Sequence, residues 1–281
     1  MLVSVVGFAL MNLTIKFLDR LPATELVLFR CVISLALCLY ALRRRKISVF
    51  GNNKKWLIIR GLCGVTGLAL FFFTLQELPI GSAVTLQYLS PIFTAIFGIF
   101  ILGERVRIPQ WFFFLISFSG IAVVKGFDTN ITPPLFFAGI GSALFSGLAY
   151  ASVRKLKDTD HPLVVVLYFP LIATPIMLVA SIFNWVQPQG WEWTLLLLVG
   201  IFTQIAQVNM TKALQSAEAN EITGMKYLGI VFALSFDFLI FDVRYSIFAL
   251  AGIILVLLGV VANLVYKARL RKRKSLLFSK T

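Results

Sequence analysis

The chain alternates long apolar stretches with short polar connections from one end to the other. A membrane-spanning helix needs about 20 largely apolar residues. Ten stretches meet this requirement, and they cover residues 2–18, 24–42, 56–75, 80–102, 109–125, 134–153, 163–184, 193–211, 219–241 and 245–266. Because a helix satisfies its own backbone hydrogen bonds inside lipid, this pattern predicts an all-α integral membrane protein with ten transmembrane helices.

The composition agrees with a chain that folds mainly in lipid. Of the 281 residues, 59% are hydrophobic and 14% are charged, whereas soluble domains carry about 25% charged residues. The net charge of +14 suggests nucleic-acid binding at first, but the basic residues lie in the connections between apolar stretches, which argues against nucleic acid as a partner. The three cysteines lie in apolar stretches without a CxxC pattern, so we expect no disulfide framework, no metal site and no cofactor.

The basic residues gather in connections that lie on one side of the predicted bundle. With both termini on the same side, the connections and tail on that side carry Arg43, Arg44, Arg45, Lys46, Lys54, Lys55, Arg105, Arg107, Arg154, Lys155, Lys157, Lys212, Lys267, Arg269, Arg271, Lys272, Arg273, Lys274 and Lys280. The opposite side carries only Arg20, Lys125 and Arg244. Cytoplasmic connections are enriched in lysine and arginine, so both termini are predicted to be cytoplasmic.

An internal repeat relates the two halves of the chain. Shifting the sequence by 139 residues aligns Leu75 with Leu214, Gln76 with Gln215, Tyr88 with Tyr227, Leu89 with Leu228, Phe93 with Phe232, Phe97 with Phe236, Ile101 with Ile240, and Gly120 with Gly259. We therefore interpret residues 1–127 and 128–266 as two five-helix repeats, followed by a basic tail at 267–281. The odd number of spans inverts the second copy in the membrane, and inverted repeats are typical of secondary transporters.

Two motifs carry a resemblance to a known family. The stretch "LPIGSAVTLQYLSPIFTAIFGIFILGERVR" (78–107) contains a small-residue turn, a helix with a central proline at Pro91, and a Gly-Glu pair before a basic connection. The stretch "PATELVLFR" (22–30) opens the second predicted span. With these motifs the chain resembles the drug/metabolite transporter superfamily, in its EamA-like family. The resemblance implies two five-helix halves that rock around a central substrate site.

The second half departs from this family pattern at the ninth predicted span. The span has Ile230 where the first half has Pro91, and "FDFLIFDV" (236–243) where the family often repeats a Gly-Glu pair. Lys226 also stands where a polar or small residue is usual. These departures indicate a specialised site, so no particular substrate follows from the resemblance.

Lys226 is the most unusual polar residue within a predicted span. A charge in a membrane span costs about 2.5–3.5 kcal/mol on insertion scales. Lys226 aligns with Gln87 under the repeat and could either snorkel to water or, as we favour, contact an anionic or zwitterionic substrate. Asp237 lies 11 residues further on, on nearly the same helical face. Proton exchange on Lys226 or Asp237 could therefore couple the transport cycle.

Other polar residues within spans extend the list of candidates. The substrate-binding candidates are Asn12, Arg30, Gln87, Tyr88, Ser146, Gln204, Gln207, Lys226 and Tyr227. Interhelical hydrogen bonding is the alternative for the serine, and simple packing for the tyrosines. Arg30 could snorkel or face the cavity, whereas Lys16 and Arg60 lie near span ends and are expected to snorkel.

These observations favour a secondary active transporter that moves a small organic metabolite by alternating access. A membrane-embedded enzyme would need a catalytic constellation, and no predicted span contains a histidine or an evident pair of acids. In a non-transporting membrane scaffold, the polar residues of different spans would not need to face one common cavity. The compact chain with short connections points, by the resemblance, to a bacterial inner membrane. The expected partners are the lipid bilayer and a small-molecule substrate, with proton coupling and a homodimer left open.

Overall fold

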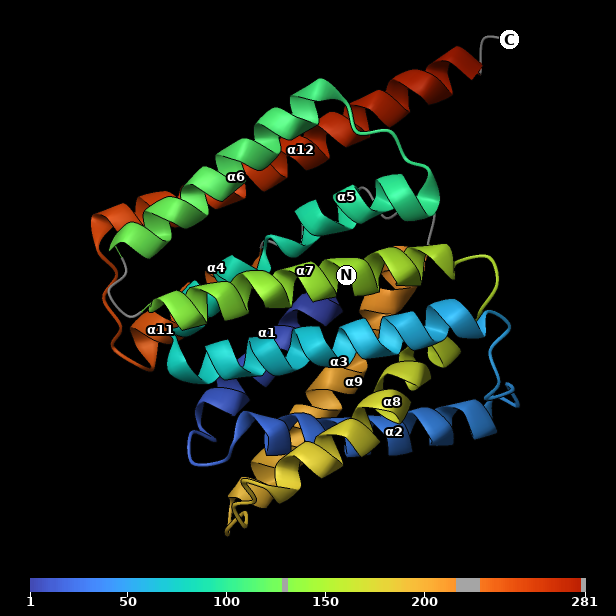
Figure 1. The fold of residues 1–281 in the computed structure, drawn as a ribbon, viewed down its shortest axis with the longest axis vertical. Coiled ribbons are helices and arrows are strands. Elements are labelled where there is room, and N and C mark those ends of the chain that lie inside the picture. The colour runs from blue at the N-terminus through green and yellow to red at the C-terminus, as the bar shows by residue number, and fades with distance from the viewer. Residues whose placement is uncertain (128–130, 216–227, 279–281) are drawn as a thin grey trace.

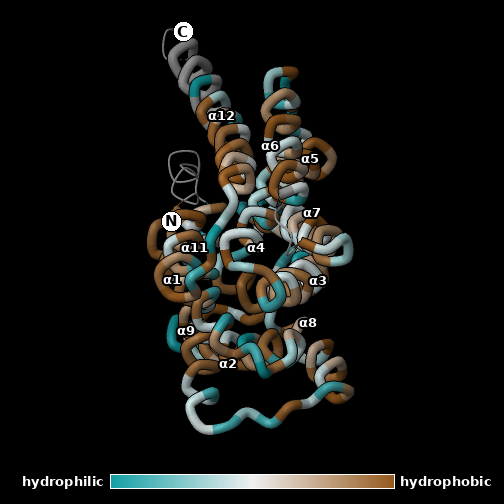
Figure 2. The backbone as a smooth tube through the Cα atoms, turned by 90° about the vertical axis from the view of Figure 1, so that its left-hand side faces the viewer, coloured by the Kyte–Doolittle hydropathy of each residue, from teal (hydrophilic) through white to brown (hydrophobic). Residues whose placement is uncertain are grey.

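The computed structural model describes residues 1–127, 131–215 and 228–278, and every regular element in these ranges is an α-helix (Figure 1). The helices are α1 (Leu2–Lys16), α2 (Ala23–Arg44), α3 (Lys54–Glu77), α4 (Ile80–Gln87), α5 (Ser90–Leu102), α6 (Ile108–Phe127), α7 (Pro133–Lys155), α8 (Pro162–Ile182), α9 (Glu192–Gln215), α11 (Leu228–Leu239) and α12 (Ile247–Phe278). Apolar residues predominate along the helices (Figure 2).

The helices follow the predicted spans closely. Seven segments of the described chain are long and apolar enough to cross a membrane: α2, α3, α4 taken with α5, α6, α7, α8 and α9. The helices α1 and α11 and the apolar part of α12 are shorter, and each lies within a predicted span. The prediction of an all-helical membrane protein is therefore confirmed.

The fourth predicted span is divided into two helices, α4 and α5. The division falls at Tyr88 and Leu89, two residues before Pro91. Proline has no N–H to donate to the carbonyl of Gln87, and its ring clashes with that carbonyl, so one continuous helix is disfavoured here. Irregular backbone at membrane depth is tolerated where it lines a cavity, which makes this break a marker for a site.

The helix contacts have the symmetry that the sequence repeat predicts. The repeat equates α1 with α7, α2 with α8, α3 with α9, α5 with α11, and α6 with α12, whereas the counterpart of α4, residues 219–226, lies outside the described residues. Exchanging equivalent helices converts the α1–α9 contact into α3–α7, α2–α9 into α3–α8, and α5–α7 into α1–α11. It leaves the α2–α8 and α6–α12 contacts unchanged. The two halves therefore pack around a pseudo-two-fold axis.

The same symmetry holds for individual residues where α6 packs against α12. A Cβ atom on Gly120 would lie 2.6 Å from the backbone nitrogen of Val256, and one on Gly259 would lie 2.4 Å from Ser117 Oγ. Gly120 and Gly259 are 139 positions apart, and so are Ser117 and Val256. The two contacts are thus copies of each other, which confirms the register of the repeat in this helix pair.

The connections divide between the two ends of the bundle. The α2–α3, α5–α6 and α7–α8 connections, which carry the excess of basic residues, lie at the right-hand end in Figure 1. The α1–α2, α6–α7 and α11–α12 connections lie at the left-hand end. This segregation is the arrangement required by the predicted topology with cytoplasmic termini.

We expect Gly120→Ala to lower the thermal stability of the detergent-solubilised protein. The added methyl group would meet the α12 backbone, and overpacking of this kind costs about 1–3 kcal/mol. The matched control is Gly126→Ala on the same helix, because a Cβ atom there has no neighbour within 4 Å. Equal melting temperatures for the two variants would contradict the close contact between α6 and α12.

Candidate functional site

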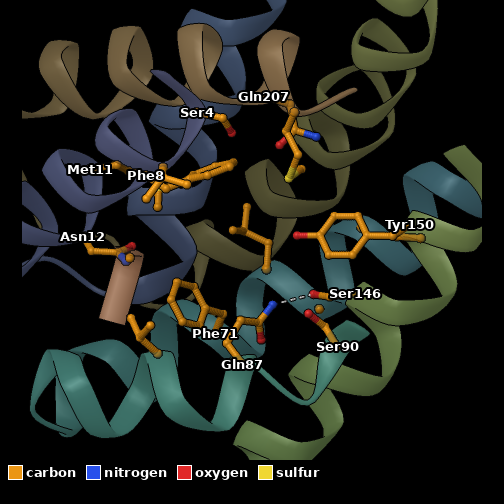
Figure 3. A pocket seen from close by; sticks show the side chains of 18 of the residues that line it. Ser4, Phe8, Met11, Asn12, Phe71, Gln87, Ser90, Ser146, Tyr150 and Gln207 are labelled. Atoms are coloured by element: carbon orange, nitrogen blue, oxygen red, sulfur yellow. Dashed lines mark hydrogen bonds between the residues drawn. The ribbon is translucent and has the colours of Figure 1, made fainter. Parts of the chain in front are cut away.

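A cavity of about 180 Å³ lies between the two halves, next to the break between α4 and α5 (Figure 3). It is lined by residues of α1, α2, α3, α4, α5, α7, α8 and α9, together with Gly229 of α11. Along α1 its lining runs from Met1, just before the helix, to Asn12, so the cavity follows most of this helix from its N-terminus.

Six of the nine predicted substrate-binding residues line this cavity: Asn12, Arg30, Gln87, Tyr88, Ser146 and Gln207. They come from five different helices and from the α4–α5 break. Asn12 Oδ1 and Gln207 Nε2 are buried, and neither has a hydrogen-bond partner in the described part of the chain. The cavity therefore offers one acceptor and one donor to a ligand at these two positions. Their roles in binding remain predictions.

The Gln87 side chain is held in place by two serines of α7. Gln87 Nε2 donates to Ser146 Oγ at 2.9 Å, and the Ser142 hydroxyl donates to Gln87 Oε1 at 2.7 Å. The Tyr150 hydroxyl, also on α7, points into the same space (Figure 3). The predicted alternative for the serine, interhelical hydrogen bonding, is thus realised while Ser146 also faces the cavity.

Gln204 differs from Gln207, although their spacing predicts that the two share a face of one helix. The structure does not place Gln204 in the cavity lining. Ser34 Oγ donates to Gln204 Oε1 at 2.5 Å, and Gln204 Nε2 lies 2.9 Å from Cys38 Sγ. Gln204 therefore joins α2 to α9. The i, i+4 spacing puts Ser34 and Cys38 on one face of α2, but it does not by itself point to Gln204.

Arg60 is a cavity residue that the sequence did not reveal. It lines the cavity and is only 4% exposed, so the expectation that it snorkels is wrong. Its side chain runs along α3 toward the bundle interior, because a Cβ atom on Gly64 would lie 2.3 Å from Arg60 Nη1. Glycine one turn after the arginine leaves the space for this conformation. The spacing of Arg60 and Gly64 is visible in the sequence, but it does not by itself fix the direction of the arginine side chain.

Arg30 lies close to Arg60 in the same cavity and is 3% exposed. Its Nε donates to Thr203 Oγ1 at 2.8 Å. The guanidinium carbons of Arg30 and Arg60 lie 5.5 Å and 5.2 Å from the centroid of the Phe169 ring. Neither arginine forms a salt bridge with any residue that the structure describes. The cavity therefore contains two neighbouring positive charges.

The predicted coupling residue Asp237 lies outside the cavity lining and binds the start of α4. Asp237 is completely buried, and its carboxylate accepts hydrogen bonds from Ile80 N (3.0 Å), Gly81 N (2.6 Å) and the Tyr245 hydroxyl (2.5 Å). A carboxylate at a helix N-terminus satisfies the unpaired N–H groups and complements the helix dipole. Asp237 thereby connects the second half of the chain to the first.

Lys16 binds the same α3–α4 connection from the opposite direction. Its ammonium group donates to the carbonyl oxygens of Leu75 (3.1 Å), Gln76 (2.8 Å) and Leu78 (2.8 Å) at the end of α3. Lys16 is only partly buried, and its ammonium group binds the carbonyl groups of a helix C-terminus at the end of the bundle, so the expectation that it snorkels stays a prediction. These contacts lie at the end of the bundle opposite Met1.

An ion pair adds to the contacts at this end. Arg20 Nη2 lies 2.5 Å from Glu192 Oε2, joining the α1–α2 connection to the start of α9. The hydrogen bond from Arg20 to Glu192 raises the pKa of the Arg20 guanidinium above its ordinary value. Polar contacts thus cross the bundle at the end away from Met1, and those of Lys16 and Arg20 and those between Asp237 and α4 join segments distant in the sequence.

Lys226 and Tyr227 lie outside the described residues, so their predicted roles stay predictions. Among the residues that are described, no group of three or more His, Cys, Asp or Glu side chains is placed to hold a metal ion.

Comparison with known proteins identifies the relatives of this chain. The model of the EamA-like transporter family matches it twice, over residues 1–125 and 134–265. The chain is 28% identical to the pseudopaline exporter of Pseudomonas aeruginosa, covering 91% of each. It is 28% identical to the riboflavin transporter of Vibrio cholerae, covering 78% of this chain and 76% of that protein. A solved crystal structure with 21% identity has the same fold, with a TM-score of 0.67 over 96% of this chain and 98% of the other.

We expect Asp237→Asn to destabilise the protein by about 1–3 kcal/mol. The amide NH₂ of asparagine would replace one of the two buried oxygens that accept backbone N–H groups, so one N–H group would face another donor. Thermal unfolding in detergent measures this loss. Asp242→Asn is the matched control, since the Asp242 side chain is 86% exposed. A melting temperature unchanged by Asp237→Asn would show that α4 does not depend on this cap.

Proposed function

The chain belongs to the EamA-like transporter family, within the drug/metabolite transporter superfamily, and we propose that it moves a small organic metabolite, anionic or zwitterionic, by alternating access. It is a multi-pass membrane transporter and not an enzyme. The second candidate, a non-transporting scaffold, finds no support in a cavity that gathers polar side chains from both halves.

The observation that carries this proposal is the contrast between the two ends of the bundle. The cavity lining reaches Met1 at one end. At the other end, the contacts of Lys16, Asp237 and Arg20 cross between segments of the two halves or clamp the α3–α4 connection. A cavity that extends toward one side only is what one state of an alternating-access cycle requires. With the predicted topology, this state faces the cytoplasm.

The pseudo-two-fold axis suggests how the opposite state arises. Under the 139-residue shift α11 corresponds to α5 and α4 corresponds to residues 219–226, so the repeat predicts an equivalent closing contact between α5 and that segment. Rocking of residues 1–127 against residues 128–266 would separate α4 from Asp237 at one end and bring the equivalent segments together at the other. Asp237 stays the candidate coupling residue of this proposal, because its carboxylate holds the start of α4 across the two halves.

The relatives support a small organic metabolite as substrate. They include proteins described as a pseudopaline exporter, a riboflavin transporter and, at 22% identity in Rickettsia prowazekii, an S-adenosylmethionine uptake transporter. These substrates differ in chemistry and in direction of movement. Which metabolite this protein moves therefore depends on the residues of its own cavity. We place the protein in a bacterial plasma membrane with both termini in the cytoplasm, as a monomer or a homodimer.

Cross-linking α4 to α11 is expected to stop transport. A Cβ atom on Gly81 would lie 2.8 Å from Leu234 Cδ2, so cysteines at these positions are within reach of a short, reducible thiosulfonate cross-linker. The background replaces Cys31, Cys38 and Cys63 by alanine. In proteoliposomes, uptake of a metabolite selected by a thermal-shift screen should be lost on cross-linking and restored by reduction. Each single-cysteine variant serves as a control, and full transport by the cross-linked protein would refute alternating access at this contact.

The two glutamines of α9 should respond differently to substitution. Gln207→Leu removes a donor that faces the cavity, so uptake should fall by about tenfold or more while the melting temperature stays near that of the parent. Gln204→Leu removes two interhelical hydrogen bonds and should instead lower the melting temperature. If Gln207→Leu transports like the parent, this side chain is not part of the substrate site.

A further inference from the structure

We infer that Arg30 and Arg60 form a binding subsite for an oxyanion, a carboxylate or a phosphate, and that the transported metabolite has a net negative charge. This inference rests on the proposed function and narrows its substrate class from anions and zwitterions to anions. It depends on three features of the described residues: the burial of the two arginines, the absence of an acidic partner, and the remaining hydrogen-bonding capacity of the guanidinium groups.

Burial without an acidic partner leaves the positive charge uncompensated. Arg30 and Arg60 are at least 96% buried, and both are close to the Phe169 ring, so each charge increases the cost of the other. Arginine stays protonated in proteins, so neither group escapes this cost by losing a proton. A buried charge is normally paired. No described residue of the cavity lining is an aspartate or a glutamate, so none of them supplies the missing negative charge.

The two guanidinium groups keep hydrogen-bond donors of the kind that an oxyanion needs. Arg30 Nη1 and Arg60 Nε are buried, and neither has a hydrogen-bond partner among the described residues. Arg30 Nε donates to Thr203, and both guanidinium groups lie over the Phe169 ring. Stacking on an aromatic ring occupies the face of a guanidinium group and leaves the in-plane N–H groups free. Those groups match the two oxygens of a carboxylate or phosphate.

The remainder of the cavity explains why an anion is favoured over a zwitterion. Away from the arginines, the polar lining consists of neutral groups such as Asn12, Gln87 and Gln207. These can bind hydroxyl, amide or carbonyl groups. A substrate ammonium group would find no described carboxylate there and would add a third positive charge to the cavity. A metabolite with an oxyanion at one end and neutral polar groups at the other fits both regions.

A purely structural role for Arg60 makes the opposite prediction about stability. If the Phe169 contact holds the fold together, replacing Arg60 by methionine should lower the melting temperature. If Arg60 is kept for binding, Arg60→Met relieves an uncompensated charge and preserves apolar bulk, so the empty protein should melt at or above the temperature of the parent. Arg154→Met is the control for a paired arginine. It leaves Glu104 without its partner and should lower the melting temperature.

The binding test uses probes matched in size and different in charge. Purified parent, Arg60→Met and Arg60→Lys are titrated with glutarate, its neutral analogue glutaramide, glycerol 1-phosphate, glycerol, and the dication of 1,4-diaminobutane, at constant ionic strength. Binding is measured by calorimetry and by the shift in melting temperature. We expect the two anions to bind the parent. Affinity should fall about tenfold or more in Arg60→Met and less in Arg60→Lys, which retains the charge but loses the planar fork.

The possible outcomes separate this inference from the proposed function. Anion binding that is equal in the parent and Arg60→Met, preferential binding of the neutral or cationic probes, or binding of none of the probes would overturn the anion subsite. A lower melting temperature for empty Arg60→Met would also overturn it. In those cases, saturable uptake of another metabolite by proteoliposomes would leave the transporter function standing. Anion binding that depends on Arg60, in a protein that transports none of its ligands, would support the subsite and refute transport.

Discussion

The contact between the Asp237 carboxylate and the first N–H groups of α4 is the interaction on which the arrangement of the bundle depends. Inside lipid, a helix end has no water to satisfy its backbone groups, so the first N–H groups and the last carbonyl groups of a membrane helix need partners from the protein. Asp237 supplies them from the other half of the chain, and Lys16 satisfies the carbonyl groups at the end of α3. The closure of one end and the connection between the halves therefore have a common basis.

The symmetry of the scaffold contrasts with the asymmetry of its cavity. Helix contacts repeat with a shift of 139 residues, as the pair Gly120 and Gly259 shows. The same shift relates Arg30 to Phe169, two residues that contact each other near the axis. Symmetry thus provides two equivalent ways of closing the bundle. The residues that differ between the two halves provide the charged and polar groups of the cavity. If the two halves lined the cavity with identical residues, its positive charges would not both come from the first half of the chain.

Charged residues near the ends of membrane helices have three different outcomes in this protein. Lys16 binds backbone carbonyl groups, Asp237 binds backbone N–H groups, and Arg60 lies over an aromatic ring without an acidic partner in the described chain. The first two are satisfied and hold the structure together. Arg60 is buried without a described counterion. We use the presence or absence of a protein partner for the charge to distinguish a structural residue from a binding residue.

The sequence by itself determined the architecture. Apolar length fixed the helices, because lipid requires it. The 139-residue repeat fixed the symmetry, and Pro91 fixed the break in the fourth span, because a proline lacks the N–H that a continuous helix uses. The sequence also placed Asn12, Arg30, Gln87, Tyr88, Ser146 and Gln207 within spans, and the structure brought these six together.

Only the tertiary structure decided which neighbour each polar side chain meets. Helical periodicity gives the angle of a residue on its own helix, but it does not say which helix lies at that angle. Gln204 and Gln207 are therefore close in angle, yet one contacts α2 and the other the cavity. Periodicity also leaves open the direction of a long side chain. Arg60 could have extended toward water, and it turns inward because Gly64 leaves space and the Phe169 ring lies beside it.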